Sequence, residues 1–326
     1  MTIGQARLNE VSLDEKATPA RPAESIPVKA ADNIPLGIVF MIVATVAFAA
    51  THALSKWLVA TYPVGQVMFS RSAVGFVICA AILLPIQGLS VFSTQRTGAH
   101  VARGLSQSIS QTFSVLAFML MPLAGAIAIN FSAPLWAALV AIIWLKERAG
   151  PARWFVLLFG FLGVLIVTNP GMDTLTLGAL FALANAIMLG TVTVAVRSMT
   201  KTESTNTLLI WQLATVSVFH SLLLLFGFEW PSHGDAWLFV ACGVANLVGQ
   251  VFWTKALVLA PTTAVSPFFY FMLVWAIAIG YVVWDDVPTV GLLVGSCFVV
   301  ASGLYLLWYE DQRRQQAKRE QATKQA

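Results

Sequence analysis

Charge is almost absent from the middle of this chain, and this feature restricts the possible folds more than any other. Of the 34 charged residues in the 326-residue sequence, nine lie in residues 1–35 and eight in residues 310–326. Only 17 remain for the 274 residues between them, about 6%, whereas an ordinary soluble domain carries about 25%. Residues 36–309 therefore predict an integral membrane domain and exclude a soluble enzyme of this size.

Two polar tails flank this domain. Residues 1–35 hold four prolines and mixed charges, with no apolar run of signal-peptide length, which predicts a disordered cytoplasmic tail and no cleavable signal. Residues 310–326 predict a basic cytoplasmic tail, either a solvated segment that sets the orientation or one that rests on anionic lipid. Cys79, Cys242 and Cys297 stand singly in apolar runs, so we expect no disulfide and no metal site. No cofactor is expected either.

The length of the apolar region sets the number of crossings. At about 20 apolar residues per crossing, residues 36–309 accommodate about ten transmembrane helices. Apolar runs between polar, proline or glycine breaks place them at 36–60, 63–86, 101–121, 124–145, 152–168, 177–196, 206–228, 236–259, 262–284 and 290–309. The expected fold class is therefore all-α.

Lysine and arginine predict the orientation, because cytoplasmic loops are enriched in both. With the N-terminus inside, the five outside loops contain neither residue. The inside loops and the adjoining helix ends contain Arg96, Arg103, Lys146, Arg148, Arg153, Arg197 and Lys201. This separation favours an even number of helices and two cytoplasmic termini, in an inner (plasma) membrane.

An internal repeat becomes visible when the chain is shifted on itself by 139 residues. The pairs of identical residues include Gly104 and Gly243, Gln111 and Gln250, Pro122 and Pro261, and Trp136 and Trp275. The pattern indicates two five-helix units, 36–170 and 171–309, and the second is inverted because five is odd. Chance similarity between apolar helices is the alternative. Inverted repeats are typical of secondary transporters, whose substrate site lies at the repeat interface.

Two linked segments resemble a known family. Residues 122–136, with the sequence PLAGAIAINFSAPLW, run on to KERAG at 146–150, and the second half offers APTTAVSP at 260–267, DDVP at 285–288 and SGLY at 302–305. These segments resemble the signatures of the drug/metabolite transporter (DMT) superfamily, EamA type. The sequence departs from the pattern at Lys146 and Asp285, where glycine usually precedes the acid, so no subgroup is assigned.

The resemblance implies ten helices in two inverted five-helix repeats around a central cavity. It also implies transport of a small organic metabolite across the lipid bilayer by a monomer. The inverted repeat predicts alternating access, and no nucleic-acid partner is expected. Export of an amino acid or similar solute, including an aromatic one, is the first expectation. Uptake of a vitamin or cofactor of the riboflavin or S-adenosylmethionine type is the alternative, and the sequence leaves substrate, direction and coupling open.

Two stripes of polar residues are the first candidates for the cavity lining. Helix 101–121 places Gly104, Gln107, Gln111 and Ser114 on one face, and helix 236–259 places Gly243, Asn246, Gln250 and Trp253 at the same intervals. Polar groups at lipid depth normally face an interior or a water-filled cavity. Close packing between helices is the competing interpretation, because glycines permit close approach.

Further candidates lie beside prolines in the fourth and ninth helices, since proline frees a backbone carbonyl. Asn130 precedes Pro134, and Ser266 precedes Pro267, with Tyr270 one turn later. Trp136 and Trp275 can stack on a planar solute or pack as ordinary interfacial aromatic residues.

Three titratable residues inside the spans need a separate account. Arg71 either attracts an anionic group of the substrate or fixes helix packing, and His52, followed by His220, is the candidate for proton coupling. A neutral structural role is the alternative for both histidines. Every acidic residue of the membrane domain falls in a loop or at a helix end, so an acidic proton relay at the midplane is not expected.

A membrane-embedded enzyme is the rival from another class. It requires a metal-ligand cluster, paired carboxylates or a Ser/His or Cys/His constellation. The sequence offers none of these motifs, so we expect a transporter that is not an enzyme.

Overall fold

The structure is a computed structural model that describes residues 33–144, 151–168, 176–199, 203–260, 265 and 268–325, and every regular element in these ranges is helical. The longer helices are α1 (Ile34–Leu58), α2 (Val64–Gln87), α3 (Thr97–Leu120), α4 (Leu123–Asn130), α5 (Ala133–Trp144), α6 (Pro151–Thr168), α7 (Leu177–Met199), α8 (Thr205–Leu222), α9 (Ala236–Leu259), α11 (Phe271–Trp284) and α12 (Val290–Gln325). Short 3-10 segments, η1 (Gly88–Phe92) and η2 (Leu223–Phe226), follow α2 and α8.

Local sequence signals explain where two of the helices begin. Asn33 precedes α1, and its side-chain oxygen accepts a hydrogen bond from the backbone N–H of Leu36 at 3.1 Å. Ser204 caps α8 in the same way through the N–H of Thr207 at 3.1 Å. Such caps satisfy backbone donors that the first turn of a helix leaves without partners.

Helix length and apolarity agree with an integral membrane protein. Among the described residues, four helices are long and apolar enough to cross a bilayer, and they cover Ile34–Leu58, Val64–Phe92, Asn206–Phe226 and Ala236–Ala256. Shorter apolar helical segments cover Leu123–Ala137, which includes a turn, Trp154–Val167, Leu177–Thr191, Phe271–Trp284 and Val290–Tyr305. α12 continues past the predicted end at residue 309, so the basic C-terminal segment is helical as far as Gln325.

The fourth predicted helix is not continuous, which corrects the expectation for residues 124–145. α4 ends at Asn130, a turn follows at Phe131 and Ser132, and α5 begins at Ala133. Pro134 explains the break because it has no N–H to donate to the carbonyl of Asn130. Within the turn, the Ser132 hydroxyl donates to the carbonyl of Ile129 at 2.7 Å.

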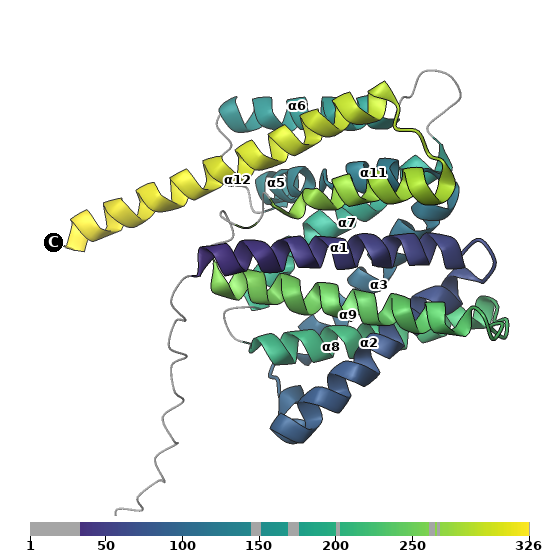
Figure 1. Cartoon of the computed structure of the whole chain (residues 1–326). Helices are drawn as coiled ribbons and strands as arrows, with labels where there is room; N and C mark the ends of the chain where they lie inside the picture. Colours follow the sequence, from purple (N-terminus) through teal and green to yellow (C-terminus); the bar gives the residue numbers. More distant parts are fainter. Residues whose placement is uncertain are drawn as a thin grey trace, which may run out of the picture. The chain divides into compact units, whose positions relative to one another are not determined.

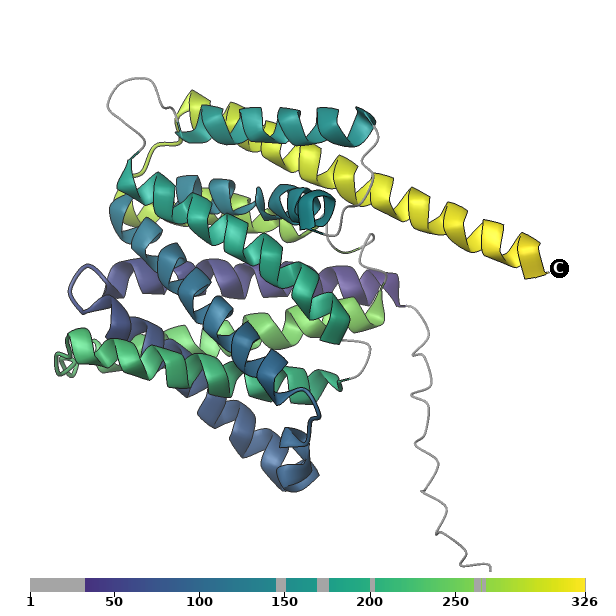
Figure 2. The same ribbon diagram turned by 180° about the vertical axis from the view of Figure 1, so that it is seen from behind.

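Helices distant in sequence lie side by side in the described part of the membrane domain (Figures 1 and 2). α1 packs on α9, α3 on α7 and α8, α2 on α8 and α9, and α4 on α11, while α6 pairs with α12. The largest buried apolar cluster includes Phe118 of α3, Ile127 of α4 and Met272 of α11. The middle of the domain is therefore built from both halves of the chain.

α6 and α12 lie side by side (Figure 1), and two glycines face each other in this contact. A Cβ atom added at Gly295 would lie 2.7 Å from the carbonyl oxygen of Gly163, and one added at Gly163 would lie 2.8 Å from that of Gly295. Small residues at such a position let two helix backbones approach closely inside a membrane.

Gly295→Val is expected to force these helices apart and to destabilise the fold by about 1–3 kcal/mol, the usual cost of overpacking. The thermal unfolding midpoint of the purified protein in detergent measures this effect. Gly98→Val is the matched control, because a Cβ atom at Gly98 meets no heavy atom within 4 Å. Equal midpoints for Gly295→Val and Gly98→Val would contradict the proposed close contact.

Candidate functional site

The centre of the candidate site is a buried arginine that belongs to neither of the two predicted polar stripes. Arg71 lies on α2 and its side chain is 4% exposed. Its Nη2 donates to Gln111 Oε1 of α3 at 2.7 Å, and its Nη1 lies 3.5 Å from Ser55 Oγ of α1. The structure thus brings two predicted site residues, Arg71 and Gln111, into contact. Ser55 is a further partner that the sequence did not indicate.

α9 completes this cluster from the other half of the chain. Cys242 Sγ lies 3.5 Å from Ser55 Oγ. A Cβ atom at Gly243 would meet the Val74 side chain at 2.5 Å and the carbonyl oxygen of Arg71 at 3.3 Å. Gly243 therefore brings α9 against α2 beside Arg71, which supports the close-packing interpretation for this stripe residue.

The two candidate histidines have different surroundings. His220 Nδ1 lies 3.2 Å from Ser72 Oγ, and its Nε2 lies 3.4 Å from the carbonyl oxygen of Ser108. His52 stacks at a tilt on Phe118, with ring centres 4.9 Å apart. Its buried Nδ1 has no hydrogen-bond partner among the described residues. His220 is thus held at both ring nitrogens, whereas His52 keeps one nitrogen open to a further partner.

A second polar chain links α3, α7 and α4. Ser110 Oγ donates to Asn185 Oδ1 at 2.6 Å, and Asn185 Nδ2 donates to Asn130 Oδ1 at 2.8 Å. Asn130 was a predicted site residue, whereas Ser110 and Asn185 were not. The available signal for Asn185 was its position as an amide inside the apolar run 177–196.

The predicted aromatic residues turn their polar atoms toward neighbouring helices or turns. Trp275 Nε1 donates to Thr45 Oγ1 of α1 at 3.2 Å, and Trp136 Nε1 donates to Ser132 Oγ at 3.1 Å. The ring of Tyr270 packs edge-on against Phe131, with centres 4.9 Å apart. These contacts place Trp275 and Tyr270 between the two halves of the chain.

The other predicted residues are not joined to these clusters by the contacts described above. Ser114 is buried, and Gln107, Asn246 and Gln250 are half-buried. Trp253 is 38% exposed, which places it toward the surface of the domain. Ser266 lies outside the described residues.

One end of the domain is closed by polar contacts between loops and helix ends. Lys56 Nζ donates to the carbonyl of Met121 at 3.1 Å and lies 3.6 Å from Asp286 Oδ2. The Tyr62 hydroxyl donates to Asp235 Oδ2 at 2.7 Å, and Ser232 Oγ donates to the same oxygen at 2.8 Å. These two hydrogen bonds stabilise the carboxylate and lower the pKa of Asp235, and the bond from Tyr62 has the larger effect.

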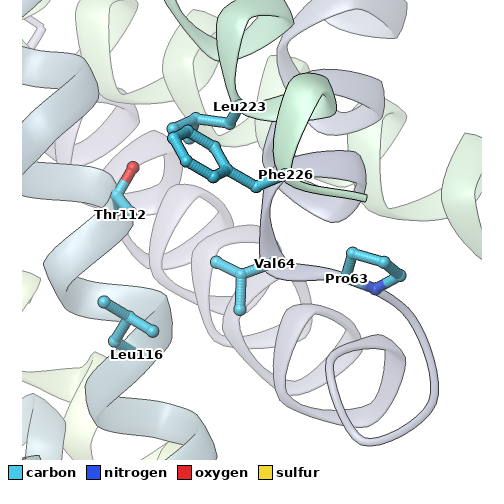
Figure 3. Close-up of a pocket in the computed structure, with 7 residues that line it drawn as sticks. Pro63, Val64, Thr112, Leu116, Leu223 and Phe226 are labelled. Atoms are coloured by element: carbon cyan, nitrogen blue, oxygen red, sulfur yellow. The ribbon is translucent and has the colours of Figure 1, made fainter. Parts of the chain in front are cut away.

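A cavity of about 210 Å³ opens near this end, between the start of α2, the C-terminal half of α3 and η2. Figure 3 shows Thr112 and Leu116 on α3, across the space from Leu223 and Phe226, with Val64 between them. Its lining is mostly apolar and contains none of the predicted site residues.

Comparison with known proteins then identifies the family. The EamA-like transporter family matches residues 35–169 and 176–308. The chain belongs to the EamA-like transporter family. This membership confirms the resemblance to the DMT superfamily and agrees with the apolar helices of a multi-pass membrane protein.

Several transporters are similar over most of their length. A riboflavin transporter of Rhizobium johnstonii is 26% identical over 85% of this chain and 93% of its own. The pseudopaline exporter CntI of Pseudomonas aeruginosa is 27% identical, over 84% and 97%, and an S-adenosylmethionine uptake transporter of Rickettsia conorii is 24% identical, over 84% and 93%. A crystal structure of a protein with 20% identity shares the fold, with a TM-score of 0.58 over 84% of this chain and 95% of that one.

Proposed function

We propose that this EamA-like protein is a secondary carrier that moves a small organic metabolite across the plasma membrane by alternating access. The observation that carries the proposal is the buried polar cluster around Arg71 and Gln111, which lies inside otherwise apolar helices of a transporter family. Polar groups at this depth are costly and usually line a solute path. We also propose that the protein is not an enzyme.

The proposed architecture is ten transmembrane helices in two inverted units, 36–170 and 171–309, around a central cavity. The packing of the described helices supports it. In the two units, α1 corresponds to α7, α2 to α8, α3 to α9 and α6 to α12. α1 packs on α9, and the equivalent helices α7 and α3 also pack on each other. In the same way, α2 packs on α9 and α8 packs on α3. The pairs α2 and α8, and α6 and α12, map onto themselves.

Gly104 and Gly243, which occupy equivalent positions in the two units, support the same symmetry. A Cβ atom at Gly104 would overlap the Thr215 side chain of α8, and one at Gly243 would overlap Val74 of α2. The proposed orientation places both termini in the cytoplasm, on the evidence of the loop lysines and arginines. We also propose a monomer as the transporting unit.

The proposed solute path runs past Arg71, Gln111, Asn130 and Tyr270. Export of an amino acid or a similar metabolite is the first proposal for cargo and direction. Uptake of a vitamin or cofactor is the second, and the relatives named as riboflavin and S-adenosylmethionine transporters favour it. For proton coupling we propose His52, because its buried imidazole Nδ1 has no hydrogen-bond partner among the described residues and is open to a further one.

Counterflow in proteoliposomes tests this function. Vesicles that contain the purified protein and an unlabelled solute are expected to accumulate the same solute in radiolabelled form transiently, because a carrier exchanges it across the membrane without ATP. The panel comprises aromatic and aliphatic amino acids, riboflavin and S-adenosylmethionine, with protein-free vesicles as the control. Absence of counterflow for the whole panel would count against the carrier.

A further inference from the structure

Arg71 is a charged group for which the described protein offers no balancing charge. A guanidinium stays protonated in proteins, so Arg71 keeps its positive charge although it is buried. Its closest polar partner, Gln111, is itself neutral. A charged arginine at the centre of a membrane helix costs about 2.5–3.5 kcal/mol on insertion scales, and a cost of this kind usually has a functional reason.

The described acidic residues of the membrane domain do not supply the missing charge, because no carboxylate among them forms an ion pair with Arg71. Asp286 pairs with Lys56 at 3.6 Å, and Glu203 lies 3.9 Å from His100. Asp235 accepts hydrogen bonds from Tyr62 and Ser232. These three acids lie at helix ends or in loops, away from the middle of the spans.

The cluster also has unused donors. Nε of Arg71 is buried and has no hydrogen-bond partner among the described residues. Gln111 uses its Oε1 to accept from Arg71, which leaves the two N–H donors of Nε2 for a different acceptor. A positive charge and a neighbouring amide donor are the chemistry that binds an anionic oxygen pair.

We propose that Arg71, together with the Nε2 amide of Gln111, binds a carboxylate group of the transported solute. A carboxylate carries one negative charge, which balances one guanidinium. A phosphate monoester carries about 1.5 to 2 negative charges and would leave excess charge in the low-dielectric interior. The inference rests on the proposed carrier function and narrows its cargo to carboxylate-bearing metabolites, such as zwitterionic amino acids.

The first test changes the solute and leaves the protein intact. Counterflow in proteoliposomes is compared for L-tryptophan, L-phenylalanine and L-leucine, each against its carboxamide, and for neutral riboflavin. At least one carboxylate is expected to be exchanged about 10- to 100-fold faster than its amide, the range for hydrogen bonds to a charged group. Exchange of riboflavin or an amide at the rate of the carboxylates overturns the inference and leaves the carrier function standing. No exchange of any compound counts against both.

The second test changes the protein. Arg71→Gln is expected to reduce carboxylate counterflow about 10- to 100-fold, whereas Arg71→Lys keeps the charge and retains part of the activity. Arg103→Gln is the matched control, since Arg103 of α3 also donates to an amide, Gln212 Oε1, at 2.5 Å but lies outside the proposed site. Rates are normalised to the monodisperse fraction in size-exclusion chromatography. Wild-type counterflow by Arg71→Gln, or equal losses for Arg71→Gln and Arg103→Gln, overturns the assignment.

If Arg71→Gln does not fold, the binding of acids and amides to the wild-type protein tests the inference instead. The midpoint of thermal unfolding in nanodiscs is then measured with each acid and its amide at equal concentration. A ligand that binds the native state raises this midpoint. A rise with a carboxylate and not with its amide supports the inference, and equal rises or no rise contradict it.

Discussion

Gln111→Leu is expected to reduce transport by about 100-fold and to lower the yield of folded protein. The substitution removes the Oε1 atom that accepts from Arg71 Nη2 at 2.7 Å. The buried guanidinium then loses its shortest hydrogen bond, a contact worth about 1.5–3 kcal/mol when one partner is charged. The initial rate of counterflow, divided by the amount of monodisperse protein, separates the effect on transport from the effect on folding.

Gln250→Leu is the matched control for the folding part of this prediction. Gln250 occupies the equivalent position in the second unit and is half-buried, as Gln111 is, but among the described residues only Gln111 accepts a hydrogen bond from the buried Arg71. Thr254 Oγ1 donates to its backbone carbonyl at 2.7 Å, a contact that leucine also offers. Folded yield is therefore expected to fall for Gln111→Leu and to stay near wild type for Gln250→Leu. Equal yields for the two variants would show that Gln111 does not support the buried arginine.

The helices were largely predictable because the physical rule behind them is local. Apolar runs and polar breaks fixed both ends of α9 and the C-terminal ends of α6 and α11. The break between α4 and α5 had a visible cause in Pro134, but proline within a span produces a kink, a full interruption or a local adjustment, depending on neighbouring helices. That choice is made by packing, which the local sequence does not determine.

The partners of the polar residues were much harder to predict. Helical periodicity predicts that Gln111 faces the protein interior, and in the structure its side chain contacts the buried Arg71, yet periodicity does not indicate which helix lies opposite. Arg71 and Gln111 are 40 positions apart, and Ser110 and Asn185 are 75 positions apart. Such pairs are decided by the tertiary arrangement. In the sequence, Ser55 and Asn185 are ordinary polar residues in apolar runs. Only the structure shows that Ser55 contacts Arg71 and that Asn185 contacts Asn130.

The polar chain through Asn185 leads to the second large effect. Asn185→Leu is expected to destabilise the fold by about 2–4 kcal/mol, because it removes the donor to Asn130 Oδ1 and the short acceptor for Ser110 Oγ, which keeps only the Asn185 carbonyl oxygen at 3.5 Å. Each buried polar group left without a partner costs about 1–3 kcal/mol. The contact between α3, α7 and α4 should loosen, and the thermal midpoint in detergent should fall by many degrees.

Asn246→Leu provides the comparison for this prediction, since it is the same substitution at a half-buried position of α9. Its thermal midpoint is expected to stay near that of the wild-type protein, whatever its effect on transport. Ser110→Ala should cost less than Asn185→Leu, because it removes only one hydrogen bond of the chain and leaves the bond between Asn185 and Asn130 intact. An Asn185→Leu midpoint equal to that of Asn246→Leu would mean that the amide chain does not hold these helices together.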